Sequence, residues 1–391
     1  MTKDKNIRLK FKCIIKQLKT KPDIQLDVYK NILTKIIFMI IYKHKCLDEY
    51  KNEYIKFDFM KEGNPMEKRI IEKMVKAMNF KKNEVVFINF WGTADEFSYL
   101  YDFENAMKNE GVTVKALAIT DEFIIEEVGG KEALLPESWF DRYDEAESVV
   151  DIISRPPGMP PQGLAKKKIP LFGEFLRGIF KKASSKKKFI QVTMPSRTNA
   201  MMAGMDYEKY RDRIIKALDI DYDELRKNCE KKISEFNGDK RIIKTGENCI
   251  LTMETTGRKW YIDAGDGAFP CGEIFIAPLE DKSNGSIFFK TLAAEGVGVF
   301  KNVTLFVEAG RVVSSDCDKF NEFLKTLPEG GNVVAELGIG MNPNVDCIEG
   351  DSALDENALG TLHIAIGMNH LFGGVNECPF HMDFVTTGEI L

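Results

Sequence analysis

The stretch NEVVFINFWGTADEFSYLYDFENAMKNEGVTVKALAI, residues 83–119, sets the architecture of the first half of this chain. It holds an apolar run typical of a buried strand, a helical segment at 96–109, and a second apolar run at 112–119. Strand, helix and strand at this spacing are typical of a βαβ unit in a parallel sheet. An amphipathic helix is predicted just before it, in MEKRIIEKMVKAMNF at 66–80. Because no GxGxxG follows the first strand, a dinucleotide-binding role has no support.

The second half of the chain has a different local composition, with short stretches rich in Thr, Val, Ile, Phe and Gly that each fit a strand. We therefore expect an α/β N-terminal domain with a parallel sheet at 66–245, and a β-rich α+β C-terminal domain at 246–391. Within the first domain, prolines and lysine clusters at 155–190 predict a loop that bears a short helix. Residues 1–65 end at a Gly-Asn-Pro breaker and are expected to be a basic N-terminal extension, with Met66 as an alternative start.

Length and composition suit a soluble globular protein of about two domains. The chain has 391 residues, of which 44% are hydrophobic and 29% charged. The longest apolar run, Ile36 to Tyr42, is far shorter than the roughly 18 to 20 residues that span a bilayer, so we expect no membrane partner. No signal peptide is recognisable. The eight cysteines are scattered without a CxxC pair, which indicates reduced thiols and a cytoplasmic location.

The charge is uneven along the chain. The net charge is −5, yet residues 1–65 hold 15 basic and 8 acidic side chains. A basic arm could contact nucleic acid. The whole chain is rich in lysine, however, and the arm lacks interleaved aromatic residues, so we expect no nucleic-acid partner.

Three of the four histidines, His363, His370 and His381, lie close together near the C-terminus. Imidazole is the commonest metal ligand, and carboxylates are its usual companions. His381 and Asp383 form an HxD motif, whose two side chains point to one face if the segment is a strand. His363 lies in the apolar run GTLHIAIG, where a hydrogen-bonded core histidine is the alternative to a ligand.

Two glutamates lie in equally apolar surroundings, Glu273 in GEIFIAP and Glu336 in NVVAELGIG. Burial of an unpaired carboxylate is costly, so each needs a partner. The partner is either a metal ion or, for a glutamate at a strand end, water or an arginine. Two imidazoles and three carboxylates can hold two divalent ions, and they suit Zn²⁺, Co²⁺ or Mn²⁺. Two ions roughly 3.5 to 4 Å apart can lower the pKa of a shared water and polarise a carbonyl.

The motifs AELGIGMNPN, LDENALGTLHIAIG and HMD together resemble the signature of the aminopeptidase T-like metallo-aminopeptidases. GEIFIAPLED at 272–281 and PSRTNAMMAGMDYEKY at 195–210 resemble further segments of that family, so the likeness covers roughly 66–391. The resemblance implies a hydrolase that removes the N-terminal residue from peptides, and a homodimer. It also implies a set of metal ligands, in which Glu336 could act as the bridging carboxylate or the general base: Glu273, Glu336, His363, His381 and Asp383.

One position departs from the pattern of that family. Seven residues after His363 the family usually has a tyrosine that assists the transition state, and this chain has His370. We expect His370 to act as a catalytic hydrogen-bond donor or as a further ligand. Asp355 and Asn369 are either partners that hold the ligands in place or ordinary turn residues.

Two other functions remain open at this stage. The aminopeptidase T-like fold also resembles the dihydroxypyridine ring-cleaving dioxygenases, in which two histidines and one carboxylate hold a single Fe(II). His363, His381 and Asp383 could form such a site. Glu273 and Glu336 favour the hydrolase, because a mononuclear iron site needs open positions and not two more carboxylates. The third possibility is a metal-stabilised scaffold without catalytic activity.

Overall fold

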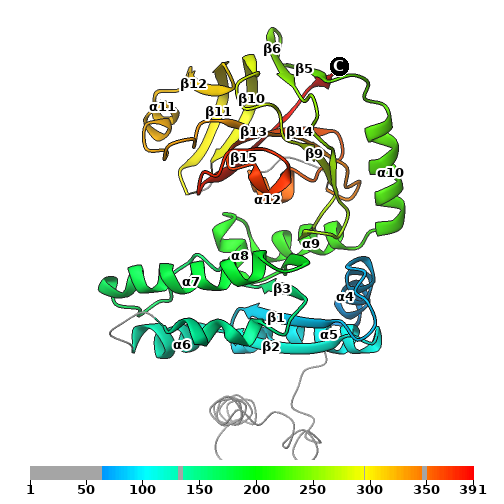
Figure 1. Ribbon diagram of the computed structural model, residues 1–391, viewed down its shortest axis with the longest axis vertical. Coiled ribbons are helices and arrows are strands. Elements are labelled where there is room, and N and C mark those ends of the chain that lie inside the picture. The colour runs from blue at the N-terminus through cyan, green and yellow to red at the C-terminus, as the bar shows by residue number, and fades with distance from the viewer. Residues whose placement is uncertain (1–63, 131–134, 295, 346–349) are drawn as a thin grey trace, which may run out of the picture. The chain divides into compact units, whose positions relative to one another are not determined.

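The computed structural model describes residues 64–130, 135–294, 296–345 and 350–391, all of which belong to one compact unit, Gly63–Leu391 (Figure 1). Two expectations, the basic extension at 1–65 and the apolar run from Ile36 to Tyr42, fall on residues outside this description, apart from the last two positions of the extension. Within the part of the chain that the structure describes, no helix is both long and apolar enough to span a bilayer.

A parallel sheet, here called sheet A, forms the first layer. Its five strands are, in spatial order, β2 (Thr113–Ile119), β1 (Val85–Trp91), β3 (Ser148–Ile153), β4 (Lys188–Thr193) and β8 (Ala268–Phe269). The interior strand β1 is an almost unbroken apolar run, because helices cover a parallel sheet on both faces. The predicted α/β region with a parallel sheet is therefore confirmed.

Helices surround sheet A. The first, α4 (Pro65–Ala77), begins where the side chain of Asn64 accepts a hydrogen bond from the backbone of Met66, and a proline occupies its first turn. The others are η1 (Ala94–Glu96), α5 (Phe97–Asn109), α6 (Asp121–Ile124), η2 (Ile125–Gly129), η3 (Glu137–Tyr143), η4 (Lys166–Lys168), α7 (Ile169–Ser184), α8 (Arg197–Met202), α9 (Tyr207–Leu218) and α10 (Tyr222–Ser234). Helix α7 has 16 residues and is longer than the short helix expected at 155–190, because Phe172, Phe175 and Ile179 recur at helical spacing and bury one face.

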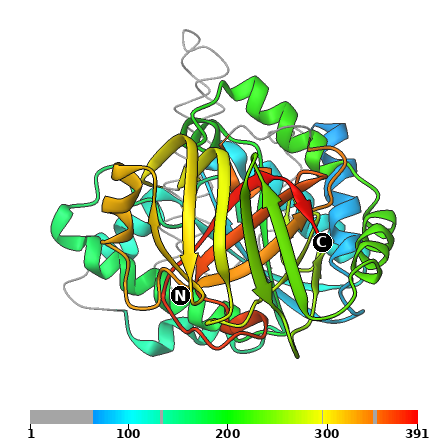
Figure 2. The same ribbon diagram turned by 90° about the horizontal axis from the view of Figure 1, so that it is seen from above.

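Two antiparallel sheets form the rest of the described chain. Sheet B consists, in spatial order, of β12 (Arg311–Ser315), β11 (Gly298–Glu308), β10 (Asn284–Ala294), β6 (Cys249–Glu254), β5 (Lys240–Thr245) and β16 (Glu389–Ile390). Figure 2 shows β10 and β11, in yellow, beside β5 and β6, in green. Along β11 burial alternates toward its end, as expected for a sheet with one solvated face.

Sheet C carries the apolar runs in which the candidate ligands lie. Its strands are, in spatial order, β15 (His381–Thr387), β14 (Thr361–Gly367), β13 (Val334–Gly340), β9 (Glu273–Ile276) and β7 (Tyr261–Asp263). The helices of this half are α11 (Asp318–Leu324), α12 (Ser352–Asp355) and η5 (His370–Phe372). The ring of Phe384 on β15 packs edge-on against Phe289 of sheet B and Phe320 of α11, at centroid distances of 6.2 and 5.6 Å. The predicted β-rich C-terminal region is confirmed.

Strand β8 connects the two halves. It follows residue 245 in the chain, yet it pairs in parallel with β4, where Gln191 is opposite Ala268 and Val192 is opposite Phe269. The second half of the chain thus completes the sheet of the first half. Domain limits at 66–245 and 246–391 stay a prediction.

A buried polar network lies in the centre of sheet A. Asn89 on β1 and Asp151 on β3 are register partners, and the amide of Asn89 donates to the Asp151 carboxylate at 2.8 Å. The hydroxyl of Tyr143 donates to the Asn89 side-chain oxygen at 2.7 Å. Burial raises the pKa of the Asp151 carboxyl to about 7, although the hydrogen bond from Asn89 acts to lower that pKa.

The substitution Asp151→Asn is expected to stabilise the protein at pH 8 and to change little at pH 5. The native carboxyl keeps its proton up to about pH 7, whereas the unfolded chain releases it near pH 4. The native state therefore binds more protons between these values, and stability falls as the pH rises through them. A shift of three units corresponds to at most about 4 kcal/mol. Urea unfolding of both proteins from pH 5 to pH 8 measures the difference, and parallel pH profiles would contradict this account.

Candidate metal centre

One face of sheet C gathers the candidate ligands. Residues paired across neighbouring strands point to the same face, and so do residues two apart along one strand. Gly340 of β13 is opposite Glu273 of β9, and Gly338 is opposite His363 of β14. On the other side of β14, Ala365 is opposite Asp383 and Gly367 is opposite His381. The full set on this face is Glu273, Glu336, His363, His381 and Asp383.

These five side chains form two groups that share Glu336. Glu273, Glu336 and His363 make one group, and Glu336, His381 and Asp383 make the other; in each, the ligand atoms lie within 4.8 Å of one another. Nε2 of His363 lies 3.1 Å from Oε2 of Glu273 and 3.4 Å from Oε1 of Glu336. Nε2 of His381 lies 3.6 Å from Oε2 of Glu336 and 3.5 Å from Oδ2 of Asp383. The structure thus brings all five predicted ligands together.

A regular ladder sets the direction of Glu336. A β-bulge shifts the register by one residue between Val334 and Glu336, so that Val334 is opposite Ile366 and Glu336 is opposite Ala365. From Glu336 onward the pairing is regular, and Glu336 lies two residues before Gly338, which is opposite His363. Because side chains alternate between the faces of a strand, Glu336 points to the same face as His363.

Two glycines on β13 leave room for the centre. A Cβ atom on Gly338 would lie 1.8 Å from Nε2 of His363. A Cβ atom on Gly340 would lie 2.1 Å from the carbonyl oxygen of Ala358 and 2.4 Å from the hydroxyl of Thr361. Glycine inside a strand often marks such a close approach. The imidazole of His363 consequently occupies the space that any other side chain at 338 would need.

The charges of the centre perturb one another strongly. Burial raises the pKa of Glu336 to about 7, and the charges of Asp383 and Glu273 add to this rise while His363 opposes it. Burial acts to lower the pKa of His381, but its hydrogen bond and charge contact with Asp383, followed by Glu336, raise that pKa to about 9. Burial likewise opposes the rise at His363, yet Glu273 and Glu336 raise its pKa well above the usual range. Groups perturbed in this way cluster at functional sites.

The side chains present suit a divalent cation. Oε2 of Glu273 is buried and makes no hydrogen bond of good geometry, although it lies 3.1 Å from the imidazole of His363. Carboxylate oxygens and imidazole nitrogens are the ligands that Zn²⁺, Co²⁺ and Mn²⁺ share. A cation at each group would satisfy the orphaned oxygen and replace the protons that the two imidazoles otherwise retain.

One acidic residue of the centre was missed by the sequence analysis. Glu356 follows α12, and its backbone carbonyl oxygen lies 2.7 Å from the position that a Cβ atom on Gly340, the register partner of Glu273, would occupy. Burial of its carboxyl, then the charges of Asp383 and Glu273, raise its pKa well above the usual range. The available signal was its place in the motif LDENALGTLHIAIG, seven residues before His363. A glutamate in a turn normally faces water, and nothing in its spacing indicated that this turn folds against sheet C.

His370 lies on a loop that borders the centre. Its side chain is exposed, and Nδ1 is 3.3 Å from the carbonyl oxygen of Asn376. Two residues later the ring of Phe372 packs edge-on against His381, with centroids 5.9 Å apart. Asn369 holds this loop, because its amide donates to Glu280 at 2.9 Å and its side-chain oxygen accepts from the backbone of Asn376. Among the described residues His370 joins neither ligand group, and its role stays a prediction.

Comparison with known proteins found a matching family model and several similar solved structures, two of which are described here. A family model described as thermophilic metalloprotease (M29) matches residues 165–386. The structure of wild-type AmpT from Thermus thermophilus is 18% identical, with a TM-score of 0.64 over 83% of this chain and 94% of that chain. The structure of 2,5-dihydroxypyridine dioxygenase from Pseudomonas putida KT2440 is 12% identical, with a TM-score of 0.55 over 83% of this chain and 92% of that chain. No curated protein gave a match. At these identities the two structures show the fold alone.

Proposed function

Because this chain belongs to the thermophilic metalloprotease (M29) family, we propose that it removes the N-terminal residue from peptides with a water activated between two divalent metal ions. The membership confirms the aminopeptidase T-like resemblance of its motifs, and the chain is a metallo-aminopeptidase hydrolase. The observation that carries the two-metal proposal is the position of Glu336, which is shared by both ligand groups.

The two groups divide the proposed ligands between two ions. Glu273, Glu336 and His363 would hold one ion, and Glu336, His381 and Asp383 would hold the other. We propose Zn²⁺, Co²⁺ or Mn²⁺ as the ions, because all three suit carboxylate and imidazole ligands. When bound, such a pair lowers the pKa of water and polarises the carbonyl of the scissile bond.

The protein's own side chains supply the remaining chemistry. Glu336 is proposed to act as the bridging carboxylate between the two ions or as the general base. Glu356 adds a fourth carboxyl group beside the proposed ligands. His370, on the bordering loop, is proposed to donate a hydrogen bond to the substrate where the family usually has a tyrosine.

We further propose a cytoplasmic homodimer that acts on peptides and binds neither nucleic acid nor membranes. Five cysteines of the described chain are free, which supports a reducing compartment: Cys229, Cys249, Cys271, Cys317 and Cys378. The homodimer is inferred from the family resemblance, and the oligomeric state is testable by light scattering.

The alternative function is ring cleavage by a mononuclear Fe(II) site, which the shared fold brings into consideration. That site needs His363, His381 and Asp383 around one ion. Among the described residues, however, His363 belongs to one ligand group, and His381 and Asp383 belong to the other. The separation favours two ions and therefore the peptidase.

Metal restoration distinguishes the two functions. The purified protein is stripped with a chelator, and Co²⁺, Zn²⁺, Mn²⁺ or anaerobic Fe²⁺ is restored separately. Hydrolysis of leucine p-nitroanilide and of a dipeptide panel is expected to return with Co²⁺, Zn²⁺ or Mn²⁺, at two ions per chain. Binding of one Fe²⁺ per chain, with oxygen uptake on a dihydroxypyridine and no peptide hydrolysis, would replace this proposal by the dioxygenase.

A further inference from the structure

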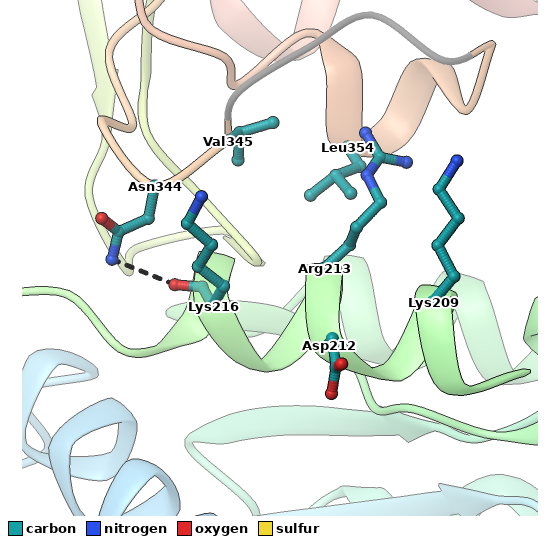
Figure 3. A pocket seen from close by; sticks show the side chains of 7 residues that line it. All are labelled: Lys209, Asp212, Arg213, Lys216, Asn344, Val345 and Leu354. Carbon is teal, nitrogen blue, oxygen red and sulfur yellow. Dashed lines mark hydrogen bonds between the residues drawn. The ribbon is translucent and has the colours of Figure 1, made fainter.

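Helix α9 anchors the segment that carries Glu356. Nη2 of Arg213 on this helix lies 3.2 Å from Oδ1 of Asp355, the residue before Glu356. Figure 3 shows the side chain of Arg213 extending from α9 toward Leu354 of α12. The guanidinium thus reaches across from the α/β half of the chain to the metal-binding half.

The ion pair between Arg213 and Asp355 is buried. The side chains are 10% and 1% exposed. Oδ2 of Asp355 also accepts a hydrogen bond from the backbone of Gly350 at 2.7 Å, so both carboxylate oxygens are engaged. Removal of one partner from a buried pair leaves an uncompensated charge, which makes such a contact stiff and costly to break.

A second connection from α9 holds the residue after Glu356. The backbone of Asn342 donates to the carbonyl of Asn357 at 2.8 Å. The amide of Asn342 in turn donates to the carbonyl of Ala217 on α9 at 3.1 Å and to that of Cys271 at 2.7 Å. Glu356 is therefore fixed on both sides, through Asp355 before it and Asn357 after it.

Further hydrogen bonds hold the C-terminal end of α9 against the segment around Glu356. The amide of Asn344 donates to the carbonyl of Lys216 at 3.0 Å (Figure 3). It also donates to the carbonyl of Asp219 at 3.0 Å. The backbone of Ala358 donates to the carbonyl of Asp355 at 3.1 Å, which closes the turn that contains Glu356. These hydrogen bonds, together with the ion pair of Arg213 and Asp355, connect the turn to α9.

We propose that Arg213 is a positioning residue, which holds Glu356 at the metal centre through Asp355. The inference rests on the proposed function, because the position of Glu356 affects catalysis only if the centre binds ions. Arg213 acts through Asp355 and makes no contact with the reacting atoms. Through Arg213, a helix of the α/β half of the chain thus controls the position of Glu356 in the other half.

The substitution Asp355→Asn tests this role, because it keeps the shape of the side chain and removes its charge. Partners that orient metal ligands typically contribute 10–100-fold to metal affinity or activity. Glu356 is outside both ligand groups, so we expect the lower end of this range, about 10-fold. Titration of the stripped protein with Co²⁺ is expected to show an affinity loss of roughly this size for one of two ions, with an altered visible absorption spectrum. In peptide hydrolysis, kcat is expected to fall while KM changes little. Arg213→Lys keeps the positive charge and is expected to lose less affinity than Asp355→Asn.

A second ion pair on the same helix is a matched control. Arg211 lies 2.7 Å from Glu67 of α4, with side chains that are 20% and 11% exposed. The substitution Glu67→Gln is expected to lower the melting temperature, as Asp355→Asn does, and to leave the Co²⁺ titration and spectrum unchanged. A general loss of stability would affect both variants alike, so the comparison separates positioning from stability.

Identical Co²⁺ titrations for the wild type, Asp355→Asn and Glu67→Gln would overturn the proposal. If Asp355→Asn does not fold, Arg213→Gln takes its place, because it removes the charge that pairs with Asp355, and an unchanged titration and spectrum in that variant would overturn the proposal equally. These readouts need no peptide. A wild type without peptide hydrolysis, whose Co²⁺ affinity still depends on Asp355, would therefore refute the proposed function and uphold the positioning role.

Discussion

Peptide hydrolysis by the variant Glu336→Gln is expected to fall by roughly 10³-fold or more, because two bound ions stabilise the transition state by several kcal/mol. Glu336 is the one side chain present in both ligand groups. Glutamine has the same shape but carries no charge, and its amide NH₂ would face His363 or His381. Both ions should therefore be lost, and not one alone.

Metal content and kcat measured on the same preparation test this expectation. The metal content of dialysed protein is expected to fall from two ions per chain to none or nearly none. Glu308→Gln is the matched control, because Glu308 is exposed on β11 and outside both ligand groups. A Glu336→Gln protein that keeps two ions and wild-type turnover would refute the bridging role of Glu336.

The substitution Gly338→Ala is expected to have the second-largest effect. Its new methyl group would lie 1.8 Å from Nε2 of His363, far inside any real contact distance. His363 is 1% exposed and cannot turn into solvent, so either the imidazole or the ladder between β13 and β14 must shift. A misplacement of about 1 Å costs roughly 10²-fold in rate, and overpacking of a core costs about 1 to 3 kcal/mol in stability.

Gly158→Ala is the appropriate control for this substitution, because a Cβ atom there has no other heavy atom within 4 Å. We expect Gly158→Ala to match the wild type in kcat, metal content and melting temperature. Gly338→Ala should lose activity and metal affinity together. Full activity in Gly338→Ala would show that the centre tolerates displacement of His363, against the geometry described here.

Much of the architecture follows from local patterns. The apolar run at Val85–Trp91 and the helix after it predicted a βαβ unit, because the change from strand to helical periodicity is visible in a short window. The clustering of three histidines near the C-terminus, with the HxD motif of His381 and Asp383, predicted a candidate metal site, because imidazole and carboxylate groups are common metal ligands. The cost of burying a carboxylate added Glu273 and Glu336. These features depend on neighbours in sequence or on the cost of burial.

Features that depend on distant pairing could not be predicted. Strand β8, Ala268–Phe269, is too short to show a strand periodicity in the sequence. It is recognised as a strand only by its parallel pairing with β4. Glu356 is in a turn, and its approach to sheet C depends on contacts with α9 that are remote in sequence. The importance of Gly338 also depends on register, because its missing side chain matters only beside His363.

Because β4 is synthesised before β8, the β4 edge of sheet A can pair with β8 only after β8 has left the ribosome. β4 ends at Thr193 and β8 begins at Ala268, about 75 residues later. At roughly 5–20 residues per second, translation of that stretch takes roughly 4–15 s. Throughout this interval β4 is the open edge of a parallel sheet, and an open edge invites pairing with strands of other chains. Slow translation between these two strands would lengthen the exposure, whereas a chaperone that covers the β4 edge would protect the nascent chain.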